Sequence, residues 1–158
     1  MPNWCHNRVD IYSENLKDLK AIKSIFKSER PLHQIIPEPD WYTVPLSKED
    51  STKYGNKVGK VGELPIPPDL TEKWSTTHFK STGHSDERWY DWRINNWGIK
   101  WDIADIDIEH EDKNQITYSF ETPWGPPQEI CEALREKFEN VNITWFYDEP
   151  GMALAGYL

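Results

Sequence analysis

The residues with the greatest capacity for chemistry in this sequence lie in one aromatic segment, residues 89–101. Four of the nine tryptophans of the chain fall there, with Arg93, Lys100 and two asparagines between them. Indole rings stack on planar ligands, side-chain amides hydrogen-bond base edges, and cationic side chains pair with phosphate. This combination of residue types predicts a binding site for a small nucleotide-like ligand.

Further tryptophans and asparagines stand where predicted secondary-structure elements begin or end. The candidate ligand-binding residues are Asn3, Trp4, Trp89, Arg93, Asn96, Trp97, Lys100 and Trp124. The alternative interpretation is a tryptophan core beneath one end of the sheet, because a buried indole needs a partner for its N–H group. In that case asparagine side chains hold turns, and the rings that pack together are Trp4, Trp97, Trp101 and Trp124. The sequence leaves both interpretations open.

Residues suited to catalysis or metal binding are sparse. The five histidines show no metal-ligand spacing, and the two cysteines, Cys5 and Cys131, are expected to be buried free thiols. The chain has neither a Gly-rich phosphate loop nor a nucleophile elbow. Asp102, Asp105 and Asp107 could meet a divalent ion, and Asp148 or Glu149 could be a catalytic carboxylate. A nucleotide hydrolase could act through Asp102, Asp105 or His6. Solvated surface acids explain these carboxylates more simply, so the sequence favours a non-enzymatic binding module without metal or cofactor.

Charge and hydropathy restrict the class of protein. The net charge is -9 and the mean hydropathy is -0.82. This charge disfavours sequence-independent binding to nucleic acid, since phosphate affinity comes from clustered lysine and arginine. It leaves open an acidic interaction module that inhibits another protein, or a chain that forms a homo-oligomer. No apolar run is long enough to span a membrane and no signal peptide is recognised, so we expect a cytoplasmic protein without membrane contact.

Hydrophobic periodicity predicts an α+β chain that forms one domain, residues 1–158. Apolar residues alternate in the predicted strands and recur at helical spacing in the predicted helices. The predicted elements are a strand 3–12, a helix 14–27 capped by Ser13, an irregular insertion 38–85, a helix 86–97 stopped by Gly98, a strand 100–110 with a bulge near 104–105, a strand 115–122, a helix 127–139, a strand 142–148 and a short strand 152–158. This β-α-β-β-α-β order predicts a ferredoxin-like antiparallel sheet with helices on one face and a long insertion before the second strand.

Four sequence blocks occur together in a fixed order. They are Met-Pro-Asn-Trp-Cys at 1–5, the aromatic segment with its following aspartate at 89–102, Phe-Glu-Thr-Pro-Trp-Gly-Pro-Pro at 120–127, and Glu-Pro-Gly-Met at 149–152 followed by Ala-Gly-Tyr. In these blocks the chain resembles the YubB-type ferredoxin-like family of phage and plasmid proteins. The resemblance implies a ferredoxin-like fold, expression in a host cytoplasm and a role in host interference, including counter-defence. It assigns no catalytic residue, because the biochemical role of that family is not established.

Overall fold

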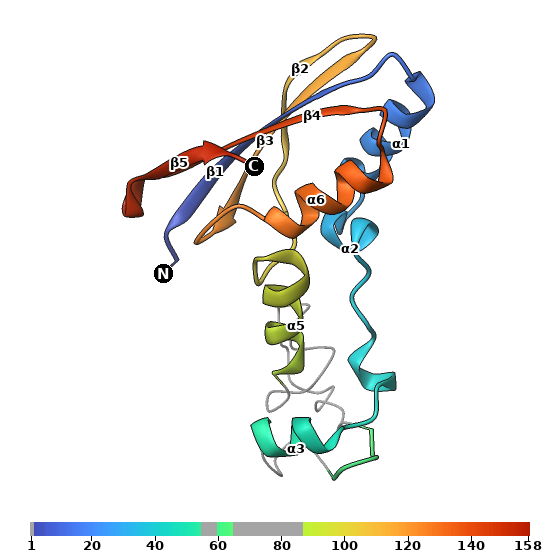
Figure 1. Cartoon of the computed structure of the whole chain (residues 1–158), viewed down its shortest axis with the longest axis vertical. Helices are drawn as coiled ribbons and strands as arrows, with labels where there is room; N and C mark the ends of the chain where they lie inside the picture. Colours follow the sequence, from blue (N-terminus) through green and yellow to red (C-terminus); the bar gives the residue numbers. More distant parts are fainter. Residues whose placement is uncertain (1, 55–59, 65–86) are drawn as a thin grey trace. The chain divides into compact units, whose positions relative to one another are not determined.

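The computed structural model describes residues 2–54, 60–64 and 87–158 (Figure 1). The chain divides into two compact units. The first, here the sheet unit, comprises residues 1–37 and 93–158. The second, here the insertion unit, comprises residues 38–92. That the whole chain forms one domain stays a prediction.

The sheet unit contains a five-stranded antiparallel sheet in the order β2-β3-β1-β4-β5. The strands are β1 (Trp4–Tyr12), β2 (Asp107–Glu111), β3 (Gln115–Pro123), β4 (Asn142–Glu149) and β5 (Leu154–Tyr157). Cys5, Asn7, Val9 and Ile11 of the central strand are buried, whereas the residues between them lie on the other face. The first four strands have the ferredoxin-like order, and β5 extends the sheet beyond β4, so the predicted fold class is confirmed.

Two amphipathic helices cover one face of this sheet, α1 (Leu16–Lys27) and α6 (Gln128–Lys137) (Figure 1). The side chains that they bury are Leu19, Ile22, Phe26, Ile130, Cys131 and Leu134. Phe26 stacks on Tyr118 with ring centroids 4.4 Å apart, which joins α1 to the middle of β3. The short helix α2 (Pro31–Ile35) follows α1. None of the helices in the described ranges has the length and apolarity needed to cross a membrane.

The cap of α1 differs from the prediction. Asn15, and not Ser13, accepts the N–H groups of Lys17 and Asp18 through its side chain, so the helix begins at Leu16. The Ser13 hydroxyl instead accepts the backbone N–H of Asn15. Leu16 therefore lies in the exposed first turn and is not among the side chains that α1 buries.

The second strand is much shorter than the predicted strand 100–110. Ile99 and Ile103 are buried, but the segment between them has no strand pairing. The Asp102 carboxylate accepts the backbone N–H groups of Leu32 and His33 at the start of α2, which fixes the segment there. Burial raises the pKa of Asp102 above its ordinary value, against these hydrogen bonds. The register shift of β2 falls between Ile108 and His110, and not at the predicted positions 104–105.

The insertion unit has regular structure of its own. It contains η1 (Trp41–Thr43), α3 (Lys48–Tyr54) and the first half of α5 (Arg88–Trp97). The buried Arg88 guanidinium donates to the carbonyl oxygens of Trp41 and Val44 and lies 5.2 Å from the centroid of the Trp41 ring. The predicted start of the helix at residue 86 lies outside the described residues. At its other end α5 stops before Gly98, whose φ of +80° confirms the predicted helix stop.

A buried chain of hydrogen bonds crosses the core of the sheet unit. The Trp145 indole N–H on β4 donates to Oδ1 of Asn7 at 3.0 Å. Nδ2 of Asn7 donates to Oγ1 of Thr122 at 2.8 Å, and that hydroxyl donates to the carbonyl of Gly125 at 2.7 Å. Because each polar group is satisfied inside the protein, the chain links three neighbouring strands to the turn between β3 and α6.

That turn holds Trp124 in a left-handed backbone conformation with a φ of +70°. The backbone N–H of Trp124 donates to the carbonyl of Asn3 at 2.8 Å, which ties the turn to the start of β1. A residue with a Cβ atom loses roughly 1–2 kcal/mol in this conformation. The turn therefore stores strain at a position whose side chain is more than half exposed.

We expect Asn7→Ala to lower the free energy of unfolding by about 3 kcal/mol, since it removes three hydrogen bonds and leaves the buried Trp145 N–H without a partner. Urea denaturation followed by circular dichroism measures this loss. Asn142→Ala, at an exposed position of β4, is the matched control and should change the value by less than about 0.5 kcal/mol. Equal effects of the two variants would contradict the role of the buried amide.

At position 124 we expect the usual order of alanine and glycine to be reversed. Trp124→Gly should be more stable than Trp124→Ala by about 1 kcal/mol, because only glycine adopts a positive φ without a steric penalty. Both variants lose the same indole contacts, so the difference between their stabilities measures the backbone strain at this position. Thermal unfolding of the pair measures it, and a more stable alanine variant would show that the turn is not strained.

Candidate functional site

The eight candidate residues divide between the two units. Trp89 lies in the insertion unit, where its ring meets Tyr90 edge-on with centroids 5.6 Å apart. The other seven lie in the sheet unit, at the end of α5, in the segment that follows it, at the start of β1 and in the turn after β3. Seven of the eight candidates therefore belong to one compact unit.

Trp97 and Arg93 are core residues. Trp97 is fully buried, and its indole N–H donates to the carbonyl of Ile36 at 2.9 Å. Arg93 is 5% exposed, lies 5.1 Å from the centroid of the Trp97 ring and donates to the carbonyl of Lys100 at 3.1 Å. These contacts close the end of α5 over Gly98, and the burial of Trp97 is what the core interpretation expects for that ring. Asn96, between them, is half-buried.

Trp4 and Trp101 form an exposed aromatic pair. Their ring centroids lie 6.3 Å apart at an interplanar angle of 37°. Trp4 is 42% exposed at the first position of β1, and Trp101 is half-buried. The ammonium of Lys100 lies 4.3 Å from the centroid of the Trp101 ring, a cation–π contact. We call these three residues, Trp4, Lys100 and Trp101, the tryptophan patch.

Trp101 is the member of the patch that the sequence did not assign to a ligand. Its position after Gly98 is the signal that could have identified it, because a residue beyond a helix stop is released from the helix phase that buries Trp97. Lys100 directly before it supplies a cation at the same place.

Asn3 and Trp124 flank the patch through the backbone. The register of the sheet pairs Trp4 with Pro123, the last residue of β3, and the backbone N–H of the following residue, Trp124, donates to the carbonyl of Asn3. The Asn3 side chain packs against the turn after β4, since a Cβ atom placed on Gly151 would lie 2.8 Å from its Nδ2 atom. Trp124 is 54% exposed. Asn3 thus supports the strand ends, and Trp124 presents a ring to solvent.

The carboxylates considered for a hydrolase have structural or solvent positions. Asp102 caps α2, as described above, while Asp105 and Asp107 are exposed. Glu149 is buried and accepts the N–H groups of Gly151 and Met152. In residues 2–54, 60–64 and 87–158, no group of three or more histidine, cysteine or carboxylate side chains could hold a metal ion.

Two further features are the cysteines and an open groove. Cys5 and Cys131 are buried free thiols, as predicted, and burial raises the pKa of Cys5 to about 11, so it is a poor nucleophile at neutral pH. A groove of about 560 Å³ is lined by Tyr12, Ser13, Glu14 and Asn15 and by residues 139–142. It lies at the opposite end of β1 from Trp4.

Comparisons with known proteins identify the same fold. Residues 100–158 match the family model of the ferredoxin-like domain in Api92-like protein. The whole structure is similar to the crystal structure of a protein api92 from Yersinia pseudotuberculosis, with a TM-score of 0.59 and 12% identity, over 99% of this chain and 93% of that chain. No curated protein matches the sequence. At this identity the structural similarity establishes the fold alone. The chain thus has the ferredoxin-like plan, and its residues 100–158 are similar to the ferredoxin-like domain in Api92-like protein.

Proposed function

We propose that this protein is a non-enzymatic binding module that stacks the base of a nucleoside or mononucleotide on the tryptophan patch. The observation that supports the proposal is the exposed Trp4–Trp101 pair with the Lys100 ammonium beside it. All three residues belong to the sheet unit, so a single compact body supplies the site.

The exposed indoles favour a planar aromatic guest. A surface tryptophan keeps a large apolar ring in water, and a ring stacked on it removes that area from solvent. Stacking of a base on an aromatic side chain contributes roughly 1–3 kcal/mol. Trp124 offers a further ring. It directly follows β3, the strand whose last residue pairs with Trp4, and its backbone conformation is strained.

Charge sets the number of phosphates that such a guest can carry. Lys100 is the cation of the patch, whereas the chain as a whole carries a net charge of -9. Two residues along β1 from Trp4, His6 faces its cross-strand partner Glu121 on β3, and their side chains are in contact. A guest with one phosphate binds more tightly because of the Lys100 ammonium, but each additional phosphate is repelled by the negative charge of the rest of the chain. We therefore favour a nucleoside or monophosphate over a triphosphate or a polynucleotide.

The biological setting that we propose follows from the resemblance to phage and plasmid proteins of the YubB type. A mobile-element protein that withdraws a small nucleotide from solution would deprive a host defence system of its signal. Such a role requires binding and no turnover, in keeping with a site built from tryptophan and lysine.

We expect isothermal calorimetry to detect binding of AMP, with Trp4→Ala lowering its affinity about tenfold because half of the stacking pair is lost. The matched control is Tyr12→Ala, which removes an exposed aromatic from the other end of the same strand and should change the affinity less than twofold. Equal losses in both variants, or no heat with any of a panel of nucleosides and nucleotides, would exclude the patch as the site.

The substitution Lys100→Gln tests how much the ammonium contributes to binding of the phosphate. In the unmodified protein we expect AMP to bind more tightly than adenosine, and ATP more weakly than AMP. The substitution should lower the AMP affinity about threefold, to the level of adenosine, and leave adenosine itself unchanged. A variant that still prefers AMP would show that another residue contacts the phosphate.

A further inference from the structure

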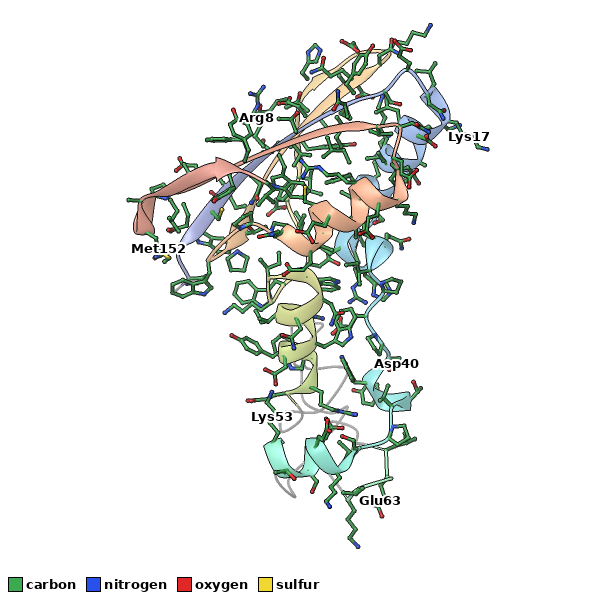
Figure 2. All side chains as sticks on the ribbon, viewed as in Figure 1. Arg8, Lys17, Asp40, Lys53, Glu63 and Met152 are labelled. Carbon is green, nitrogen blue, oxygen red and sulfur yellow. The ribbon has the colours of Figure 1, made fainter. Side chains whose placement is uncertain are left out.

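The sheet face opposite α1 and α6, here the open face, is exposed and acidic. Figure 2 shows the Arg8 side chain on this face, directed away from the two helices. The registers of β1 with β3 and β4 place the even-numbered residues of β1 there, with their cross-strand partners. Among the described residues, the carboxylates on this face are Asp10, Asp107, Glu109, Glu121 and Asp148, against the one arginine, Arg8.

An aromatic pair lies on the open face at its β5 edge. Phe146 of β4 and Tyr157 of β5 are direct partners in the register, and their rings meet edge-on with centroids 5.3 Å apart. Tyr157 is 71% exposed, which is high for so large a side chain. The Tyr157 ring is therefore accessible to a cation from solvent, with the less exposed Phe146 ring beside it.

Asp148 lies two residues after Phe146 on β4, on the same face of the sheet. Its partner on β5 is Ala155, whose small side chain leaves room beside the carboxylate. Two residues along a strand correspond to about 7 Å, so the carboxylate lies within reach of a group that contacts Phe146 or Tyr157. Within the described part of the chain, the half-buried carboxylate of Asp148 makes no ion pair or side-chain hydrogen bond. By contrast, Glu121 pairs with His6 at 2.9 Å and Glu109 with Arg8 at 3.0 Å.

We propose that the open face docks an arginine-rich segment of a partner protein, with one guanidinium held by Asp148 and stacked on the Phe146–Tyr157 pair. A guanidinium is planar, forms two parallel hydrogen bonds with a carboxylate and stacks on aromatic rings, whereas an ammonium is a compact, strongly hydrated charge. The other carboxylates of the face attract the remaining positive charges of the segment. No residue of the tryptophan patch takes part, so the two proposed sites are built from different side chains.

The sign of the charge selects a protein partner over a nucleic acid. A phosphate backbone would meet the same carboxylates and be repelled, whereas a basic segment satisfies them. Charge complementarity thus identifies the occupant, and the unpaired carboxylate beside two aromatic rings identifies its residue type.

Fluorescence anisotropy with labelled nona-arginine and nona-lysine peptides tests the proposal on the full-length protein. We expect nona-arginine to bind more tightly than nona-lysine, and Asp148→Asn to lower the nona-arginine affinity about fivefold. Tyr157→Ala should lower the affinity for nona-arginine more than that for nona-lysine, since stacking favours the guanidinium.

The matched control is Glu136→Gln, which removes one negative charge from an exposed position on α6. It should change the nona-arginine affinity less than twofold, with circular dichroism confirming that each variant is folded. If Glu136→Gln and Asp148→Asn have equal effects, or if the two peptides bind alike to every variant, the attraction is diffuse and the proposed docking site is wrong.

Discussion

The hydrogen bonds of the buried Asn7 side chain are the interaction on which the sheet unit most depends. Asn7 lies in the middle of the central strand and joins the Trp145 indole on one side to the Thr122 hydroxyl on the other. A buried amide is costly unless all of its groups find partners, so this position tolerates only the register in which both neighbours are present. The same chain of bonds continues to Gly125 and fixes the turn that carries Trp124. The core and the exposed aromatic surface are thus linked through one side chain.

Tryptophan has two separate roles in this unit, and the helix stop at Gly98 divides them. Before the glycine, Trp97 is buried beneath Arg93 and bonded to Ile36. After it, the left-handed backbone changes the direction of the chain, and Trp101 reaches the partly exposed start of β1. One aromatic segment therefore supplies both a structural plug and part of a surface, which reconciles the two interpretations that its composition allowed.

The order of strands and helices was predictable from the sequence because it rests on local periodicity. Alternation in β1, β3 and β4 and the apolar stripes of α1 and α6 each follow from a few neighbouring residues. The strand predicted from residue 100 was wrong because Ile99 and Ile103 are buried without strand pairing, while Asp102 binds the start of α2, nearly 70 residues earlier in the chain. No local pattern contains that contact.

The residue types of the candidate site were predictable, but the individual residues that form it were not. A helical segment with aromatic and amide residues on several sides has no single apolar stripe, so the sequence does not show which tryptophan faces the core. Burial of Trp97 depends on the carbonyl of Ile36, and exposure of Trp101 depends on where β1 begins. Both depend on contacts between residues that are far apart in the sequence. The register of the sheet likewise decides that Asp148, and not its neighbour Glu149, reaches the open face.

The electrostatics of the two proposed surfaces are compatible because they have opposite preferences. The tryptophan patch offers an ammonium to an anionic guest, whereas the open face offers carboxylates to a cationic one. Trp4 and His6 are successive residues of β1 on the same face, so the two surfaces adjoin. A phosphate bound at the patch adds negative charge beside the open face and strengthens the attraction for a guanidinium there. By thermodynamic linkage the guanidinium strengthens binding of the phosphate by the same factor, so the proximity of the two surfaces couples their ligands instead of setting them in competition.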